Sequence, residues 1–191
     1  VLLIGGPSGS GKNTYALSVG RRDPRLVRFV NADVIAKGLG GSDSAPAVIR
    51  AGRLMLEHLH ALAEAGESFS FEATLAGRSH ARFMRMLRDR GFLTELTFVG
   101  IDSVGISSSR VAQRAAEGGH NIPLPDIERR FSRVFRNLFD EYLDSVDTWS
   151  MYNNSGPQAF ELIAEKPFGQ REIIHDSPPY QRYRRFAGHG A

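Results

Sequence analysis

The residues with the clearest chemical potential form a glycine-rich segment near the start of the chain. It reads Gly6-Pro7-Ser8-Gly9-Ser10-Gly11-Lys12, the Walker A spacing of a glycine, four residues and then Gly-Lys. Glycines allow such a loop to fold tightly enough for successive backbone N–H groups to point at phosphate oxygens. A helix that starts at the loop adds the positive end of its dipole, and the lysine reaches the β- and γ-phosphates. The segment predicts ATP binding, with a glycine-rich turn as the alternative.

The residue after Lys12 departs from this motif. A Ser or Thr normally stands there and binds Mg²⁺ through its hydroxyl, whereas this chain has Asn13. Thr14 is rotated by about 100° along the helix, so it cannot substitute directly. The carboxamide oxygen of Asn13 can serve as a hard-cation ligand. Either the Mg²⁺ site is reshaped and works, which we favour, or the protein binds nucleotide without turning it over.

An acidic residue follows the second expected strand. In open α/β sheets the ligand crevice lies at the carboxyl ends of the strands, where Asp33 is expected. A carboxylate there can accept the proton of an attacking hydroxyl as a general base. The alternative is an N-cap for a short helix over residues 34–38, since Asp is a favoured cap.

Polar residues also follow the third and fourth expected strands. Glu72 and Thr74 can bind substrate hydroxyls or hold waters of Mg²⁺, and Glu72 can instead cap the helix that begins near Arg78. Arg78 either contacts a phosphate of the acceptor or lies on a solvated helix face. Asp102 either resembles a Walker B acid or caps a turn.

Arginines suited to phosphoryl transfer lie on two helices expected after the fourth strand. Arg110 and Arg114 are four residues apart and share one helix face. Arg130 lies at the edge of the apolar stripe of the next helix. A well-placed arginine neutralises the charge that builds on a transferring phosphoryl group. With a glycine hinge at residues 118–119, the two helices predict a lid at about 107–142; solubility is the alternative role of each arginine.

These residues need a scaffold, and the rest of the sequence predicts an α/β one. Short apolar runs alternate with helical-period segments, which indicates a parallel sheet with helices on both faces and a helical lid, a P-loop NTPase-type fold. The expected strands are residues 1–5, 26–31, 68–72, 93–101, 148–153 and 158–165. The expected helices include residues 11–19, 107–117 and 126–143. Another is expected after the capping residues Ser42 to Ser44, with an apolar stripe from Val48 to Leu62. We expect one domain over residues 1–191, with a tail at 166–191 whose role is open.

Composition limits the classes of function. The chain has 191 residues, no cysteine and a net charge of +3. Disulfides, thiolate metal sites and cysteine nucleophiles are therefore excluded, and we expect a reducing, cytoplasmic setting. Apolar runs fall short of the roughly 18 residues of a membrane span, so no membrane partner is expected. Tyr180 and Tyr183 alternate with arginines and could stack on nucleic acid, but a tail docked on the domain is the preferred interpretation.

Several ordered segments together resemble the zeta toxin family and its free-standing bacterial relatives. They are the glycine loop, Phe29-Val30-Asn31-Ala32-Asp33, Phe71-Glu72-Ala73-Thr74-Leu75-Ala76-Gly77-Arg78, Gly118-Gly119-His120-Asn121-Ile122-Pro123 and Tyr152-Asn153-Asn154-Ser155. The resemblance covers residues 1 to about 165, and the Asn13 position departs from the motif. His120, in the third segment after the loop, is interpreted as a residue that holds the lid turn.

The resemblance implies an ATP-dependent kinase that uses Mg²⁺ and phosphorylates the sugar 3′-hydroxyl of UDP-N-acetylglucosamine. It implies that Asp33 is the general base, that Glu72 and Thr74 contact the acceptor, and that Arg114 and Arg130 act from the lid. It also raises the expectation of a neutralising antitoxin. A polynucleotide 5′-hydroxyl kinase and a degenerate nucleotide-binding module are the alternatives.

Overall fold

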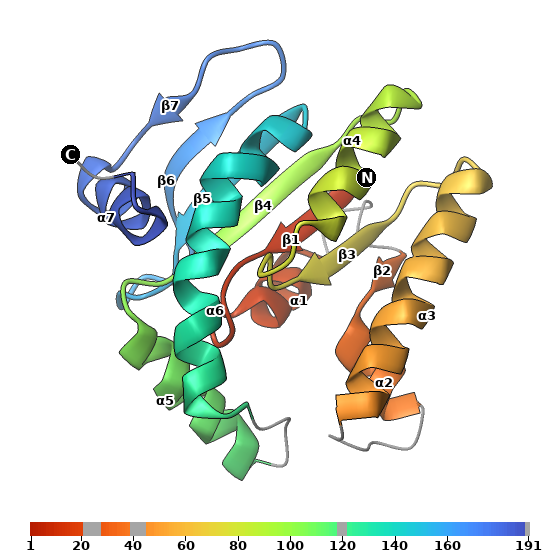
Figure 1. The fold of residues 1–191 in the computed structure, drawn as a ribbon. Helices are drawn as coiled ribbons and strands as arrows, with labels where there is room; N and C mark the ends of the chain where they lie inside the picture. The colour runs from red at the N-terminus through yellow and green to blue at the C-terminus, as the bar shows by residue number, and fades with distance from the viewer. Residues whose placement is uncertain (21–27, 39–44, 118–121, 190–191) are drawn as a thin grey trace.

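The protein folds around a twisted seven-stranded sheet (Figure 1). The computed structural model describes residues 1–20, 28–38, 45–117 and 122–189. The strands are β1 (Leu2–Gly5), β2 (Phe29–Val30), β3 (Ser70–Ala73), β4 (Glu95–Gly100), β5 (Thr148–Asn153), β6 (Glu161–Lys166) and β7 (Ile173–Ile174). Their order is β2-β3-β1-β4-β5-β6-β7. The first five are parallel, and β6 and β7 are joined to the sheet by antiparallel pairing.

Helices cover both faces of this sheet, as predicted. They are α1 (Lys12–Gly20), α2 (Ala32–Gly38), α3 (Ala45–Glu64), α4 (Ser79–Asp89), α5 (Val104–Ala116), α6 (Leu124–Asn137) and α7 (Ser177–Ala187). Side chains alternate along the central strand β1, so Leu2 and Ile4 pack with Ala16 of α1. Leu3 faces the other way, into the main core beneath α3, α4 and α6. All four residues of β1 are buried, which explains its uninterrupted apolar sequence.

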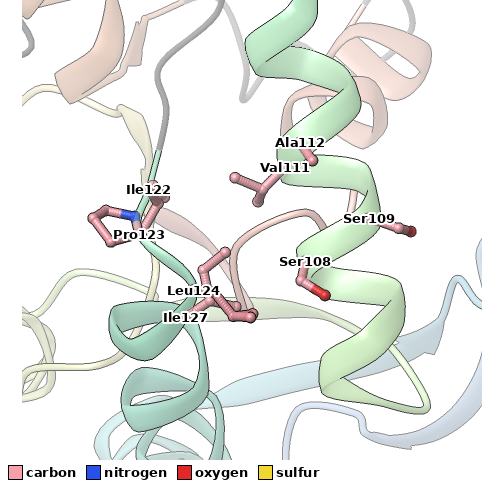
Figure 2. Close-up of a pocket in the computed structure, with 8 residues that line it drawn as sticks. All are labelled: Ser108, Ser109, Val111, Ala112, Ile122, Pro123, Leu124 and Ile127. Atoms are coloured by element: carbon pink, nitrogen blue, oxygen red, sulfur yellow. The ribbon is translucent and has the colours of Figure 1, made fainter.

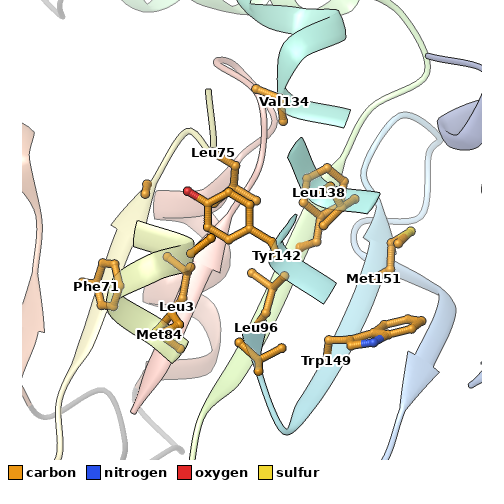
Figure 3. Packing of buried hydrophobic residues seen from close by; sticks show 14 of the residues in the cluster. Leu3, Phe71, Leu75, Met84, Leu96, Val134, Leu138, Tyr142, Trp149 and Met151 are labelled. Atoms are coloured by element: carbon orange, nitrogen blue, oxygen red, sulfur yellow. The ribbon is translucent and has the colours of Figure 1, made fainter. Parts of the chain in front are cut away.

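The main core is built by apolar stripes on helices and by the inward side chains of the strands (Figure 3). The α3 stripe predicted from the sequence places Met55 and Leu59 in this core, and Ala51 is buried as well. The side chain of Val48 and the expected caps at residues 42–44 lie outside the described residues. The second strand was expected at 26–31; its described part is Phe29–Val30, and residues 26 and 27 are outside the described ranges.

The helix expected at 126–143 ends earlier than predicted. Regular α6 stops at Asn137 and continues as a π-helical turn over Leu138–Tyr142 and a 3₁₀ turn over Leu143–Ser145. The wider turn keeps Leu138 and Tyr142 in the core, and the Tyr142 hydroxyl donates to the Gly77 carbonyl at 2.7 Å. Apolar periodicity is retained across this change, so it could not reveal where the α-helix ends.

The C-terminal tail docks on the domain through buried aromatic rings. Tyr180 and Tyr183 of α7 are 3% and 0% exposed, and the Tyr183 hydroxyl donates to Asn153 Oδ1 at 3.0 Å. Because their rings are buried, they do not form a stacking surface for nucleic acid. Arg182 pairs with Asp102 at 2.5 Å, and Ser103 caps α5. Ser103, rather than Asp102, therefore caps α5, and the Asp102 carboxylate is paired with the tail.

The parallel topology fixes where a ligand can bind. The two strands that follow β1 in the sequence, β2 and β3, lie on one side of it in the sheet, and β4 lies on the other side. Such a switch point opens a crevice at the carboxyl ends of the strands. The glycine-rich loop follows β1 directly, at this position.

Among the helices in the described ranges, none is long and apolar enough to cross a bilayer.

Candidate active site

The loop between β1 and α1 has the tight backbone that its glycines predicted. Gly6 and Gly9 have φ values of +150° and +72°, which side chains rarely adopt. A Cβ on Gly6 would collide with the Val99 carbonyl oxygen, and one on Gly9 would lie 2.7 Å from the Ser107 carbonyl oxygen. The loop is therefore pressed between β4 and α5, and this close approach adds a second reason for glycine at both positions.

Consecutive carbonyl groups of the loop accept hydrogen bonds from side chains. Lys12 Nζ donates to Pro7 at 2.9 Å, Ser107 Oγ to Ser8 at 2.7 Å, Arg110 to Gly9 at 3.4 Å and Asn154 Nδ2 to Ser10 at 2.8 Å. Ser10 N also donates to the Pro7 carbonyl, at 3.3 Å, so the loop closes into a turn beside Lys12. These contacts hold the backbone in the kind of tight turn from which an anion nest is built.

We expect Gly9→Ala to weaken ATP binding by about tenfold, because a methyl group at this position would push the loop away from α5. The matched control is Gly66→Ala. Gly66 has a similar φ of +70°, but apart from its two chain neighbours no described residue has an atom within 4 Å of the place that a Cβ would take. Both changes add strain on the order of 1–2 kcal/mol, so both should lower the melting temperature. Equilibrium binding of ATP should separate them, and equal losses of affinity would contradict the role given to this contact.

Lys12 is held at the mouth of the loop by contacts with a carbonyl and a carboxylate. Its side chain is 6% exposed, and besides the Pro7 carbonyl its Nζ lies 3.6 Å from Glu72 Oε1. Glu72 comes from β3, the neighbour of β1, in which Ile4 pairs with Glu72. A cation and a carboxylate therefore face each other at the carboxyl edge of the sheet. Arg78 precedes α4 and makes no side-chain cap bond, while Glu72 contacts Lys12 and Asn31.

Asn13 is drawn into the same group of polar side chains. Asn31 Nδ2 lies 2.8 Å from Asn13 Oδ1 and 3.0 Å from Glu72 Oε2. An amide oxygen has two lone pairs, so Asn13 Oδ1 keeps one after this hydrogen bond. Mg²⁺ at phosphate sites uses one or two protein oxygens and fills its other positions with phosphates and water. The Asn13 oxygen fits such an ion, while Thr14 is exposed and the Glu72 oxygens face Lys12 and Asn31.

Asp33 lies in the first turn of α2, at the carboxyl edge of the sheet. Its side chain is outside what the structure describes. The helix begins at Ala32, one residue before Asp33, and Ile35 N donates to the Asn31 carbonyl at 3.2 Å. The alternative of Asp33 as N-cap of a helix starting at Val34 is therefore wrong, because the residue that precedes the helix is Asn31.

Beyond Glu72 at the edge of the crevice, Thr74 is exposed. Arg78 contacts one carboxylate and one amide, which belong to α6 and the turn that follows it. Arg78 lies 3.4 Å from Glu141 Oε1 and donates to Asn137 Oδ1 at 3.4 Å, with 52% of its side chain exposed. The hydrogen bond from Arg85, helped by the charge of Arg78, holds the pKa of Glu141 below its usual value. Arg78 is thus oriented at the edge of the site and keeps half of its surface open.

The lid arginines occupy different surroundings. Arg110 reaches the loop, and Arg114 lies one turn further along the same face of α5. Arg130 is partly buried, unlike Arg129, and lies 3.8 Å from Asp126 of its own helix. An apolar hollow of about 460 Å³ separates the two helices (Figure 2), lined by residues that include Val111, Leu124 and Ile127. Gly118, Gly119, His120 and Asn121 lie outside the described residues.

Four residues of the site were not singled out from the sequence. Ser107 and Asn154 anchor the loop, Asn31 links Asn13 to Glu72, and Leu75 packs on Gly5. Leu75 is 1% exposed with φ of +58°, a strained value for a leucine. The signal for three of them was present, since Asn31, Leu75 and Asn154 occur in segments that resemble the zeta toxin family. Ser107 gave none, because one serine in a helix is unremarkable.

The strand order β2-β3-β1-β4-β5, with a glycine-rich loop and buried lysine after β1, defines an α/β P-loop protein of the kinase-like type. The chain belongs to the AAA domain family, whose model matches residues 1–136. An uncharacterized protein of Haemophilus influenzae is 30% identical over 126 residues, which are 66% of this chain and 88% of that protein.

Solved structures share the fold. The AvrRxo1-ORF1:AvrRxo1-ORF2 complex with sulphate ions contains a chain with a TM-score of 0.75 at 17% identity; the match covers 95% of this chain and 62% of that one. Another structure of that complex holds ATP. A chain of the PezAT chromosomal toxin-antitoxin system of Streptococcus pneumoniae matches with a TM-score of 0.56 at 17% identity, over 80% of this chain and 66% of that chain. The fold expected from the zeta-toxin resemblance is confirmed.

Proposed function

We propose that the protein is an ATP-dependent phosphotransferase that moves the γ-phosphate to a hydroxyl group of a small molecule. The observation that carries the proposal is the tight glycine-rich turn after β1, in which each carbonyl from Pro7 to Ser10 accepts a side-chain hydrogen bond and Lys12 is held beside the turn. This arrangement suits a polyphosphate, because backbone amides and a lysine would share its charge. The ATP-bound structure of the AvrRxo1 complex, which has the same fold, supports this choice of nucleotide.

The chemistry assigns a part to each side of the crevice. The acceptor hydroxyl oxygen attacks the γ-phosphorus, the bond from that phosphorus to the β–γ bridging oxygen breaks, and ADP leaves. Asp33 receives the hydroxyl proton, while Lys12, Arg114 and Arg130 balance the charge of the transferring group. Mg²⁺, when bound, neutralises charge on the β- and γ-phosphates; Asn13 is the protein oxygen we assign to it.

We propose that the acceptor binds beside Glu72, Thr74 and Arg78. Glu72 and Thr74 can accept hydrogen bonds from sugar hydroxyls, and the half-exposed Arg78 guanidinium suits a phosphate. A nucleotide-activated amino sugar such as UDP-N-acetylglucosamine combines both features. Because the PezAT system is a toxin-antitoxin system, a protein partner of the antitoxin kind is part of this proposal.

The test is incubation of the purified chain with ATP, Mg²⁺ and separate hydroxyl acceptors, with products identified by mass. UDP-N-acetylglucosamine is expected to gain one phosphoryl group. Phosphorylation only of a 5′-hydroxyl oligonucleotide would select the polynucleotide kinase. ATP binding without transfer to any acceptor would select the nucleotide-binding module, and absence of ATP binding would refute the proposal as a whole.

A further inference from the structure

The unusual Asn13 has a specific partner in Asn31, and the atoms that meet can be identified from chemistry. The amide nitrogen and oxygen of an asparagine are assigned by their hydrogen bonds. One terminal atom of Asn31 lies 3.0 Å from Glu72 Oε2 and 2.8 Å from Asn13. A carboxylate oxygen accepts hydrogen bonds, and the other oxygen of Glu72 lies 3.6 Å from Lys12 Nζ. That atom of Asn31 is therefore the amide nitrogen.

The same reasoning then identifies which terminal atom of Asn13 faces Asn31. The nitrogen of Asn31 carries two hydrogens, and one of them is directed to Glu72. The other needs an acceptor, so the atom of Asn13 at 2.8 Å is Oδ1. A rotation of either amide by 180° would set two acceptors or two donors against each other. The ion pair of Lys12 and Glu72 thus determines, through Asn31, which way the carboxamide of Asn13 faces.

This chain of contacts explains how an asparagine can occupy a position that usually holds Ser or Thr. A hydroxyl there can donate directly to a carboxylate, whereas a carboxamide oxygen cannot. Asn31 supplies the missing donor, because its NH₂ group bridges the Asn13 oxygen and the Glu72 carboxylate. Asn31 is 7% exposed, so water competes little for these hydrogen bonds.

We propose that Asn31 is a positioning residue that adapts this P-loop to Asn13, holding the Asn13 carboxamide oxygen toward the cation that accompanies ATP. The inference rests on the proposed function, because it assumes that the loop binds ATP. It implies that Asn13 and Asn31 act as one unit, and that restoring the usual serine at position 13 alone damages the site.

Asn31→Ser is the variant that isolates this role. Serine is as good as asparagine at the residue before a helix, so the start of α2 is retained. Its hydroxyl has one hydrogen and a shorter reach, so it cannot bridge Asn13 and Glu72 together. We expect the Kd for ATP with Mg²⁺ to rise about 5- to 20-fold, the scale of a lost hydrogen bond to a charged group. The Kd for ATP in EDTA should change less than about twofold, since the nest and Lys12 remain.

A double-mutant cycle tests the coupling. Asn13→Ser should also weaken binding of ATP with Mg²⁺, and the double variant should bind within about twofold of Asn31→Ser, because each change removes the same contact. The control is Asp147→Asn, an amide-for-carboxylate change in a partly buried pair with Thr94 at the opposite edge of the sheet. This control should leave both Kd values unchanged.

The outcomes separate the two proposals. If the native chain does not bind ATP, the proposed function fails. If the native chain binds ATP but Asn31→Ser binds it equally well, with or without Mg²⁺, the positioning role fails alone. Three further results would each overturn the pairing of Asn13 with Asn31. They are an equal loss of ATP affinity in Mg²⁺ and in EDTA, losses of affinity that add in the double variant, and tighter ATP binding by Asn13→Ser.

Discussion

Asp33→Asn is expected to lower the rate of phosphoryl transfer by about 100-fold or more while ATP affinity stays nearly constant. A general base contributes roughly 10²- to 10⁴-fold, and an amide of the same shape cannot take the proton of the acceptor hydroxyl. In the proposed function the loop and Lys12 hold ATP, so its binding should not depend on this carboxylate. The rate is measured as ADP release with a saturating acceptor, and ATP affinity by equilibrium titration.

The position of Asp33 defines the control for this experiment. Asp33 lies in the first turn of α2, where a negative charge also interacts favourably with the helix dipole, so a small loss of stability accompanies the change. Asp89→Asn makes the same chemical change at the last residue of α4, which runs from the crevice edge to the opposite edge of the sheet. It should transfer phosphate at the native rate. A native rate for Asp33→Asn would move the base to another residue.

The scaffold of this site was largely predictable because it follows from local patterns. The continuous apolar run at residues 1–5 indicated a central strand, and Gly-Lys after it indicated the loop. The strand predicted at 148–153 has those bounds, and the one predicted at 93–101 differs from β4 by one or two residues. Strand order was not predictable, since it depends on which apolar faces meet across the sheet.

The contacts that shape the site were hidden for a different reason. Ser107 and Asn154 are 99 and 144 residues from the loop carbonyls that they bind, and Asn31 is 41 residues from Glu72. Each is a common polar residue whose role depends on its partner. The tail shows the same limit: Tyr183 fills the space above Gly100, where a Cβ would collide with its ring. Neither residue indicates the other in the sequence.

The second large effect is expected from Lys12→Ala, which should lower turnover on the order of 100- to 1,000-fold, the scale for loss of one electrostatic group at a reacting centre. Affinity for ATP should also fall, by about 10- to 100-fold, because a charge-assisted hydrogen bond to phosphate is removed. Unlike Asp33→Asn, this change thus affects binding and transfer together. The same ADP-release and titration measurements distinguish the two patterns.

Lys12→Ala also takes a cation away from Glu72, whose side chain is only 15% exposed, so part of its effect could come from instability rather than from lost chemistry. Removing one partner of a buried pair leaves an uncompensated charge and destabilises the fold. Lys12→Ala combined with Glu72→Gln removes that charge while keeping a polar side chain beside Asn31. We expect the double variant to recover most of the melting temperature lost in Lys12→Ala without recovering ATP affinity or turnover. Recovery of turnover together with stability would mean that Lys12 acts by holding Glu72, and that the loop amides bind the phosphates without its charge.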